Sequence, residues 1–522
     1  MAWWQTGIIY QIYPRSFADQ SGDGIGDLQG ILAKLDYLVW LGVDAIWLSP
    51  VYPSPMADHG YDVSNYTDIH PLFGTLEEMD ALIRSAHERG LRIILDFVPN
   101  HSSSEHPWFR EARSSRHSPK RDWYLWADAK PDGSPPNNWL SVFGGSAWTW
   151  DELTQQYYYH AFLKEQPDLN WRNADVRAAM YAAMQFWLDR GVDGFRVDVL
   201  WHLIKDASLR DNPLNPDHTP AQTPYNSLLP VYSTDQPEVH DIVREMRALL
   251  DRYEARVLIG EVYLPIRRLV SYYGSDKNEA HLPFNFQLIT LPWEAPQIGA
   301  AISEYEGALP VDAWPNWVLG NHDQPRIASR VGLAQGRVAA MLLLTLRGTP
   351  TLYYGDEIGM RDGVIAPEDA EDPQGKSVGL SRDPQRTPMQ WTSEPGAGFT
   401  IGKPWLPLSL EHERRNVELE RNAPDSMLQL YRRLIELRRK EPALNMGEYR
   451  PVRAAQDLLV YLRHHAGQSY LVVLNLGHRS HLFIAPEAVG EVVLATDRAR
   501  EGERVNGRVV LTGDDGLVLR CT

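Results

Sequence analysis

The stretch Leu188-Asp-Arg-Gly-Val-Asp-Gly-Phe-Arg-Val-Asp198 joins the end of an amphipathic helix pattern to a short apolar run. The helix pattern ends at Gly191, and the apolar run ends at Asp198. The same order of helix, glycine and apolar run occurs earlier in the chain, at Gly42 and at Gly90. Apolar strands that alternate with helices are typical of a parallel sheet covered by helices. The repeated unit therefore predicts the α/β class.

Further apolar runs of strand length bring the total to about eight. The helix before Gly90 has a clear beginning, since Thr75 and Glu78 stand at capping-box spacing. Eight strands with intervening helices predict a (β/α)8 barrel, also called a TIM barrel, and a doubly wound open sheet is the competing topology. The predicted strands cover residues 6–13, 43–48, 91–98, 192–197, 257–263, 282–287, 316–319 and 349–354.

Two segments depart from the barrel pattern. Residues 101–171 are rich in Pro, Gly, Trp and Tyr, contain no long helix pattern and follow the third strand, where barrel loops expand. Residues 449–522 show short alternating runs separated by turn residues, which is typical of an antiparallel β-sandwich. We therefore expect a barrel of residues 1–100 and 172–448, a small inserted domain and a C-terminal β-sandwich domain.

The composition limits the choice of partner. The chain has 51 basic and 68 acidic residues, a formal net charge of −17, which disfavours nucleic acid and anionic membranes. Cys521 is the only cysteine, so no intramolecular disulfide can form. Neither a signal peptide nor a stretch of about 18 apolar residues is evident. We expect a cytoplasmic protein with a small neutral substrate; oligomeric state has no signal in the sequence.

Several predicted strands end in polar side chains. Because the active site of a barrel lies at the carboxyl ends of its strands, Asp198, Glu261 and Asp323 are expected to meet at one mouth. Crowded carboxylates raise the pKa of at least one of them. A glycosidase needs one ionised carboxylate and one protonated acid. Arg196, two residues before Asp198 and on the same strand face, is expected to keep Asp198 ionised.

Each of these residues has a structural explanation when it is taken alone. A strand-end aspartate often caps a helix or turn, an arginine often makes a structural ion pair, and a histidine such as His101 or His322 often packs as a hydrogen-bonded imidazole. The occurrence of four such strand ends in one chain favours an active site. They are Asp96-Phe-Val-Pro-Asn-His101, Gly194-Phe-Arg-Val-Asp198, Gly260-Glu261-Val-Tyr263 and Gly320-Asn-His-Asp323.

In that order, these segments resemble the four signature regions of the α-amylase family, glycoside hydrolase family 13. Gln166-Pro-Asp-Leu-Asn170 and Ser381-Arg-Asp-Pro-Gln-Arg-Thr-Pro-Met-Gln-Trp391 resemble the α-glucosidase and oligo-1,6-glucosidase branch of that family. The resemblance implies a retaining double displacement with Asp198 as nucleophile and Glu261 as general acid/base. Asp323 would grip the glucose hydroxyls.

The resemblance also implies a glucose-binding pocket. His101, Arg196 and His322 would hold the glucose, and Phe162 stands where the family places an aromatic residue. Asp58 and Tyr61 match the residues that close off and stack on the terminal glucose. Arg386, with Arg382 as the second candidate, matches the arginine that reaches the far side. A pocket closed by Asp58 and Arg386 admits only a chain end, so release of single glucose units is expected.

The loop Asp19-Gln-Ser-Gly-Asp-Gly-Ile-Gly-Asp27 places carboxylates at alternate positions around glycines, which suits a cation that prefers oxygen ligands. It resembles the metal loop of the branch, except that Ser21 stands where Asn is usual. The implied structural Ca²⁺ (or Mg²⁺) would be held by Asp19, Ser21, Asp23, Ile25 and Asp27. No cofactor is expected for the chemistry.

The sequence does not decide which glucosidic linkage is cleaved or whether water or a sugar accepts the glucosyl unit. In the resembled branch, a valine such as Val199 after the nucleophile goes with tolerance for α-1,6 links, and a broad-linkage enzyme is an equal alternative. A glucosyltransferase or isomerase acting on sucrose or trehalose keeps the same chemistry with a sugar as acceptor. An inactive barrel serving as a scaffold subunit is the alternative from another class.

Overall fold

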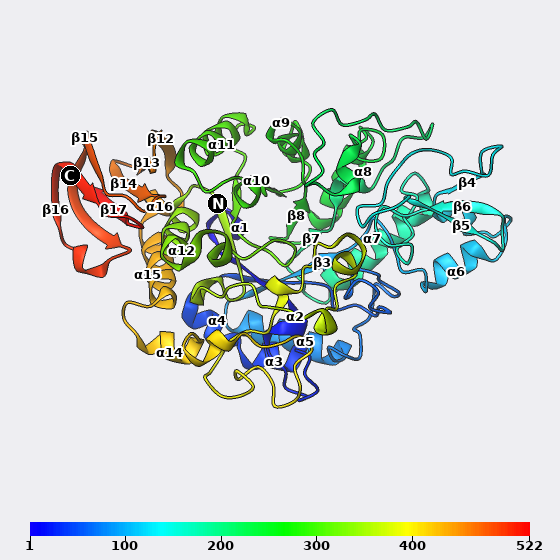
Figure 1. The fold of residues 1–522 in the computed structure, drawn as a ribbon, viewed down its shortest axis with the longest axis horizontal. Coiled ribbons are helices and arrows are strands. Elements are labelled where there is room, and N and C mark those ends of the chain that lie inside the picture. Colours follow the sequence, from blue (N-terminus) through cyan, green and yellow to red (C-terminus); the bar gives the residue numbers. More distant parts are fainter.

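The computed structural model describes residues 1–522, and its centre is a sheet of eight parallel strands (Figure 1). The strands pair in the order β10-β11-β1-β2-β3-β7-β8-β9, so the last strand along the chain returns to pair with the first. A doubly wound sheet does not have this order, and the (β/α)8 barrel is confirmed. The strands are β1 (Ile9–Ile12), β2 (Ala45–Leu48), β3 (Arg92–Phe97), β7 (Gly194–Val197), β8 (Val257–Glu261), β9 (Leu282–Phe284), β10 (Asn316–Val318) and β11 (Thr349–Tyr353).

The join between β9 and β10 differs from the other joins of the barrel. The two strands share no backbone ladder. Instead, the side-chain amide of Asn316 donates to the carbonyl of Pro283 at 2.5 Å and accepts from the backbone N–H of Asn285 at 2.9 Å. One buried side chain therefore closes the barrel where the backbone does not.

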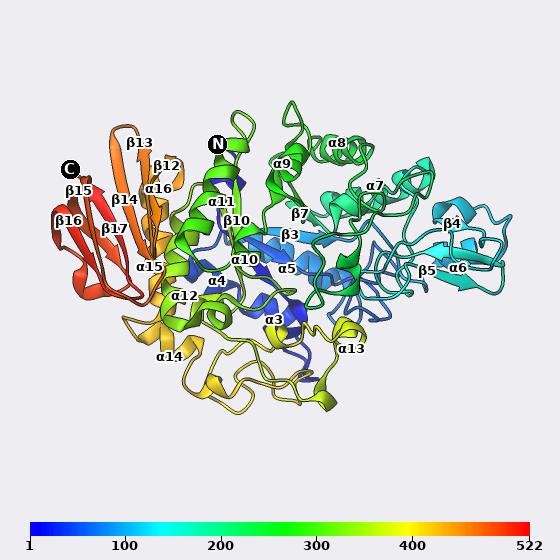
Figure 2. The same ribbon diagram turned by 45° about the horizontal axis from the view of Figure 1, so that its top comes forward.

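Helices surround the strands on the outside (Figure 2). The helix predicted from the capping box is α5 (Leu76–Glu88), and both the Thr75 and the Glu78 hydrogen bonds are present. The helix predicted before Gly42 is interrupted at Lys34, and Val39 near its end is exposed. The other barrel helices are α3 (Leu28–Ala33), α4 (Leu35–Leu41), α7 (Ala174–Asp189), α8 (Val239–Leu250), α11 (Ala295–Ala308), α12 (Ile327–Thr345) and α15 (Met427–Lys440).

The segment between β3 and α7 forms a projection at one end of the molecule (Figure 1). It holds α6 (Pro107–Arg113) and an antiparallel sheet of β4 (Trp126–Ala127), β6 (Gln156–Tyr159) and β5 (Trp148–Asp151). Packed aromatic rings such as Trp139 and Trp148 form a small core of its own. The aromatic residues of this segment are therefore used mainly for packing.

The C-terminal strands form an antiparallel domain at the opposite end of the molecule, as expected (Figure 2). Hydrogen bonds connect all six strands in the order β12-β13-β14-β17-β15-β16. Along β13, Leu459 and Tyr461 pack into the main core, whereas Leu458 and Val460 belong to a second buried cluster made only of residues from this domain. The strands are β12 (Glu448–Ala455), β13 (Leu458–His465), β14 (Gln468–Asn475), β15 (His481–Ala495), β16 (Arg504–Leu511) and β17 (Gly516–Cys521).

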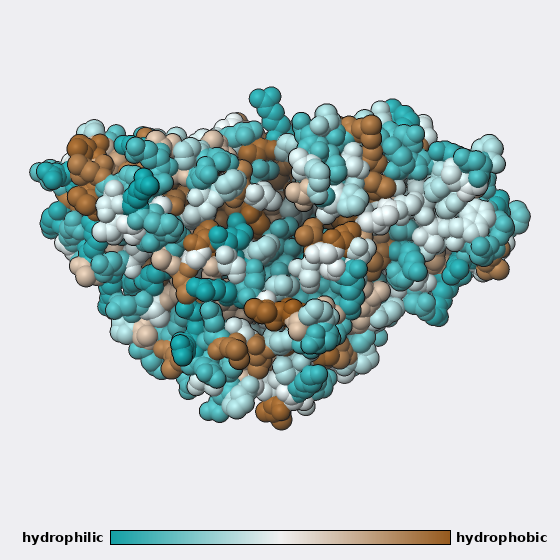
Figure 3. Space-filling model, viewed as in Figure 1, coloured by the Kyte–Doolittle hydropathy of each residue, from teal (hydrophilic) through white to brown (hydrophobic).

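The helix α12 is long and apolar enough to meet the criteria for a membrane span, although the sequence search above found no such stretch. Of its most apolar window, 61% is buried inside the protein, and the backbone is interrupted at Gly332. Its buried residues belong to the main core, which is the environment of a core helix. On the face of the molecule seen in Figure 3, hydrophobic residues form separate small groups among hydrophilic ones.

Candidate active site

A cavity of about 440 Å³ lies at the carboxyl ends of the barrel strands. Asp198 directly follows β7, Glu261 ends β8, and Asp323 lies in the turn after β10. All three line the cavity, so the structure brings together the carboxylates that the sequence singled out. Predicted residues that also line it are Asp58, Tyr61, His101, Phe162, Val199, His322 and Arg382.

Arg196 is fully buried and binds several carboxylates at once. Its Nη1 donates to Asp96 and to Asp198, each at 2.8 Å, and its Nη2 lies 2.6 Å from Oε2 of Glu261. Asp198 and Glu261 are therefore held on one guanidinium group. The rigid fork of an arginine fixes the position of both carboxylates.

Arg196 is not the only group that acts on the pKa of Asp198. Burial and the neighbouring Glu261 raise the pKa of Asp198 well above its usual range, although Arg196 acts in the opposite direction. Burial also raises the pKa of Glu261, and it raises that of Asp96 to about 6. Three buried carboxylates on one arginine favour the retention of a proton within the group. A shared proton suits a site that needs one acid and one carboxylate.

Asp323 has the opposite electrostatic environment. Its Oδ1 accepts from Arg386 at 2.9 Å and from Arg382 at 3.4 Å, and its Oδ2 lies 3.1 Å from Nε2 of His322. These neighbours lower the pKa of Asp323 despite its burial, so it is ionised at neutral pH. The hydroxyl of Tyr61 lies 2.7 Å from the same His322 nitrogen, and the two rings stack.

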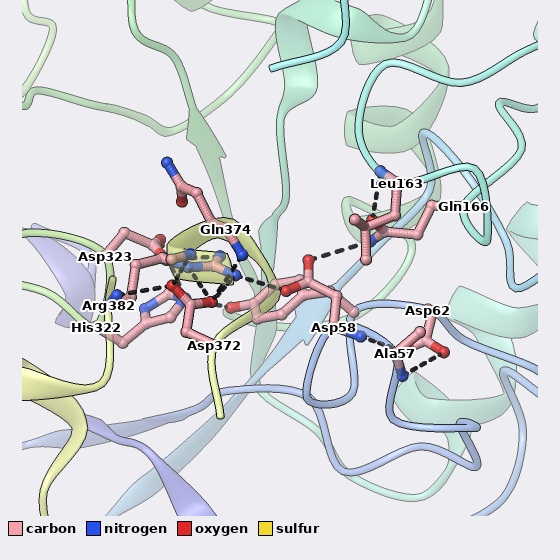
Figure 4. A network of polar contacts seen from close by, with 12 residues as sticks. Ala57, Asp58, Asp62, Leu163, Gln166, His322, Asp323, Asp372, Gln374 and Arg382 are labelled. Carbon is pink, nitrogen blue, oxygen red and sulfur yellow. Dashed lines mark hydrogen bonds and ion pairs between the residues drawn. The ribbon is translucent and has the colours of Figure 1, made fainter. Parts of the chain in front are cut away.

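Arg382 lies in the cavity wall and contacts three carboxylates (Figure 4). Its Nη2 donates to Asp58 at 2.7 Å and to Asp372 at 2.6 Å, in addition to the longer contact with Asp323. Arg386 does not line the cavity, and its Nε donates to the carbonyl of His322 from behind. The prediction that Arg386 closes the pocket with Asp58 is therefore wrong in this detail. The second candidate, Arg382, makes that ion pair.

His101 and Phe162 form another part of the wall. Nε2 of His101 lies 3.2 Å from the carbonyl oxygen of Tyr61, and the ring packs 5.3 Å from that of Phe162. Burial lowers the pKa of His101 to about 4, so it is neutral at pH 7. Gln166 donates to Oδ2 of Asp58 at 3.2 Å, which connects this wall to the Arg382 ion pairs (Figure 4).

Some residues of the site carried no prediction. Asp372 binds Arg382 but lies in a long loop outside every predicted strand, so no pattern pointed to it. Lys205 is buried after β7 and pairs with Asp168 of the inserted segment and with Asn100. In the sequence, Lys205 was marked only by the apolar residues that precede it. These contacts attach the inserted segment to the rim of the barrel.

The acidic loop near the N-terminus does not gather its carboxylates around one point. Asp19 accepts from the backbone N–H groups of Gly22 and Gly24, and Asp27 accepts from those of Ser21 and Gly30. No group of three His, Cys, Asp or Glu side chains in the structure has the arrangement of a metal site. The arrangement therefore does not fit a multi-carboxylate site, and a Ca²⁺ or Mg²⁺ held by Asp19, Ser21, Asp23, Ile25 and Asp27 stays a prediction.

Comparisons with known proteins agree with this geometry. The family model of the alpha amylase catalytic domain matches residues 11–447. A "Probable alpha-glucosidase" of Rhizobium meliloti (strain 1021) is 44% identical over 492 residues, 91% of this chain and 89% of that one. The "Oligo-1,6-glucosidase" of Heyndrickxia coagulans is 38% identical over 93% of this chain and 94% of its own. The crystal structure of an alpha-glucosyl transfer enzyme, XgtA, is similar over 100% of both chains, at 40% identity and a TM-score of 0.95.

Proposed function

The chain belongs to the alpha-amylase family, and we propose that this glycoside hydrolase is an exo-acting, retaining α-glucosidase. Its substrates are short, neutral α-glucosides, from which it releases glucose at the non-reducing end. Relatives named as glucosidases over most of the chain support the reaction class. They give no support to an inactive scaffold.

In the proposed mechanism, Asp198 attacks the anomeric carbon and Glu261 protonates the leaving oxygen. The observation that carries this assignment is that Arg196 binds both carboxylates in one cavity, at 2.8 and 2.6 Å. In the second half of the reaction, Glu261 takes a proton from water, which then attacks the glucosyl-enzyme ester. Retaining enzymes place the two carboxyl groups about 5–5.5 Å apart, and bridging by one guanidinium group is compatible with such a separation.

The glucose unit is proposed to bind between Asp323 and the ion pair of Asp58 with Arg382. Asp323 is ionised and lines the cavity, so it can accept hydrogen bonds from sugar hydroxyls. His101 and His322 also line the cavity, and burial lowers the pKa of each, so both are neutral at pH 7. The buried Asp58–Arg382 ion pair in the cavity wall supports a pocket that accepts only a chain end.

Two measurements test this function together. Proton NMR during hydrolysis of an activated α-glucoside is expected to show α-glucose as the first product, because two displacements retain the configuration. Glucose oligosaccharides labelled at the reducing end are expected to release unlabelled single glucose units from the non-reducing end. Initial release of β-glucose, or of larger fragments from the interior of an oligosaccharide, contradicts the proposal.

Glucosyl transfer is the second candidate function. The similarity to an alpha-glucosyl transfer enzyme over the whole chain favours it, because the same glucosyl-enzyme intermediate can be intercepted by a sugar instead of water. Product analysis over a range of substrate concentrations separates the two. If transfer or isomerised products dominate at every concentration, the enzyme is a glucosyltransferase or isomerase rather than a hydrolase.

A further inference from the structure

Gln11 carries a fully buried amide on the inner face of the barrel. It lies in β1 two residues after Ile9, which belongs to the apolar cluster inside the barrel, so the two side chains point the same way. Its Nε2 lies 2.8 Å from Nδ1 of His322 and donates to Oγ of Ser49 at 3.3 Å, and its Oε1 has no hydrogen-bond partner. The contacts of this amide are therefore those of a donor.

Aromatic rings fix the position of the His322 ring. It lies nearly parallel to the ring of Tyr13 at a centroid distance of 5.8 Å, and edge-on to that of Trp47 at 6.2 Å. His322 is buried and lines the cavity beside Asp323. Packing of this kind sets where the ring lies, but it does not select the nitrogen that carries the hydrogen, because both tautomers have the same shape. The hydrogen-bond partners select it.

The partners of the second ring nitrogen require a hydrogen on Nε2. Oδ2 of Asp323 lies 3.1 Å from this nitrogen, and the carboxylate is ionised, so it can only accept. The hydroxyl of Tyr61, 2.7 Å from Nε2, donates to Oδ2 of Asp96 at 3.1 Å, which leaves its oxygen free to accept. Nδ1 is then the acceptor of a neutral ring, and Gln11 supplies its donor. With the opposite tautomer, the lone pair of Nε2 would face the Asp323 carboxylate.

The environment of His322 also determines whether the ring is charged. Burial lowers its pKa to about 3; Asp323 acts against this effect, and Arg386, Arg382 and Arg196 act with it. A hydrogen bond donated to Nδ1 occupies the lone pair that a second proton needs, so it also favours the neutral ring. In the proposed reaction, positive charge develops on the glucose in an oxocarbenium-like transition state. A positive charge on His322 would raise the energy of that state.

We propose that Gln11 is a positioning residue, which holds His322 as a neutral ring with its hydrogen on Nε2. The inference rests on the proposed glucosidase function, because the charge of the ring affects the rate only through a positively charged transition state. Gln11 lies outside the cavity lining and acts through His322. The hydrogen on Nε2 also keeps the hydroxyl of Tyr61 directed at Asp96, one of the carboxylates that bind Arg196.

Two substitutions of similar size separate the donor from the volume of the side chain. Gln11→Met removes the amide and adds no charge. Gln11→Glu keeps the shape but offers a carboxylate to Nδ1. Because Asp323 holds the hydrogen on Nε2, the His322 ring is expected to take a second proton in this variant. Gln390→Met is the matched control, since the side chain of Gln390 is also buried, has no hydrogen-bond partner and lies outside the cavity lining.

The protonation of His322 is measured by NMR of the imidazole nitrogens in histidine-labelled enzyme without substrate. A His322→Gln variant assigns its signals. The wild type and Gln11→Met are expected to show a neutral ring with the hydrogen on Nε2 at pH 7, and Gln11→Glu to show hydrogens on both nitrogens. A wild-type ring with its hydrogen on Nδ1, or a Gln11→Glu ring that stays neutral, overturns the inference. The wild-type result does not depend on the folding of any Gln11 variant.

Kinetics on maltose and α-glucosyl fluoride measure the consequence for the reaction. Because a charge on the ring acts on the transition state and not on the neutral substrate, kcat is expected to fall about 5-fold in Gln11→Met and about 100-fold in Gln11→Glu, while KM changes less than about 3-fold. Gln390→Met is expected to stay within about 2-fold of the wild type, because it leaves no partner unpaired. Thermal denaturation measures the folding of each variant.

The ranking of the two Gln11 variants separates a hydrogen-bonding role from a packing role. If only the volume of the side chain matters, Gln11→Glu is the faster enzyme, and that result overturns the inference. If the wild type cleaves neither substrate, the proposed function fails. The NMR measurement still determines the state of His322 in that case, so the two failures are distinguishable.

Discussion

The backbone N–H of Val199 donates to Oε2 of Glu261 at 2.9 Å. Val199 makes this contact from a left-handed conformation, with φ 38° and ψ 47°. A β-branched residue rarely adopts such angles, and strain of this kind persists only where the surrounding structure enforces it. The residue after the proposed nucleophile thus orients the proposed acid, and its own side chain lines the cavity.

Linkage preference can be tested at this residue. The wild-type enzyme is expected to hydrolyse isomaltose, and Val199→Thr to shift the ratio of kcat/KM values towards maltose by about 10-fold, because a hydroxyl replaces a methyl group in the wall. Threonine is also β-branched, so it places similar demands on the backbone. Kinetics on both disaccharides give the answer. Wild-type turnover of maltose with isomaltose left intact contradicts the prediction.

Asp198→Ala removes the proposed nucleophile. Hydrolysis is expected to fall by about 10³-fold or more on every substrate, including α-glucosyl fluoride, because no covalent intermediate can form. Azide added to this variant is expected to occupy the vacated space and to yield β-glucosyl azide from α-glucosyl fluoride. Substantial wild-type-like turnover by Asp198→Ala would assign the nucleophile to another residue.

Glu261→Gln removes the proposed proton donor but keeps the size of the side chain. Good leaving groups need little protonation, so the loss on α-glucosyl fluoride is expected to be small for the first chemical step. On maltose, kcat/KM is expected to fall about 10²- to 10⁴-fold. Burst kinetics with the activated substrate check whether the first step survives. Equal first-step losses on both substrates rule out the acid assignment.

The ion pair of Asp58 with Arg382 is expected to act as a unit. Its atoms lie 2.7 Å apart and are buried, so removing Arg382 leaves the charge of Asp58 without a cation, whereas removing Asp58 leaves Arg382 paired with Asp372 and Asp323. A double-mutant cycle with Asp58→Ala and Arg382→Ala, read on kcat/KM, is expected to give a coupling above about 1 kcal/mol. The cycle of Asp58 with Arg386 serves as the comparison and is expected to give a smaller value. The reverse ranking would restore Arg386 as the partner.

Asp356 is expected to make stability depend on pH. It is buried, its Oδ1 has no hydrogen-bond partner, and Nη1 of Arg326 is 3.9 Å away. Burial raises its pKa to about 7, whereas an unfolded aspartate titrates near pH 3.9. Between these values the folded state binds the extra proton, so this group lowers stability as pH rises towards 7.

Asp356→Asn removes that titration. Its Tm relative to the wild type is expected to be higher at pH 8 than at pH 5, as measured by thermal denaturation in the two buffers. Asp276→Asn, at an exposed position, serves as the control and is expected to show no such difference. A Tm difference for Asp356→Asn that stays the same at both pH values contradicts the assignment.

The strand ends could be predicted because two local signals coincide there. A glycine follows the helices before β2, β3 and β7, an apolar run forms each strand, and the topology of a barrel then brings the ends of distant strands together. This was enough to place Asp198, Glu261 and Asp323 at one cavity. The capping box at Thr75 was equally local, and its helix begins where it was expected.

The partners of the charged residues could not be predicted in the same way. Arg196 was expected to act on Asp198 and on the glucose, but β3 places Asp96 beside it and β8 places Glu261 there. The choice of Arg382 over Arg386 depends on the path of a loop in which the two differ by only four positions. Such pairings depend on how separate segments pack together. The spacing of residues within one segment does not predict them.

The number of hydrogen bonds between neighbouring strands varies around the barrel. Four paired positions join β1 to β2, whereas the hydrogen bonds between the β9 and β10 segments are those of the Asn316 amide. Thermal fluctuations that part neighbouring strands therefore need to break the fewest backbone bonds at this seam, and amide hydrogens of β9 and β10 should exchange with solvent before those of the other strands. Local opening of the barrel is therefore expected between β9 and β10. This position lies between the strand that follows Glu261 and the strand that precedes Asp323.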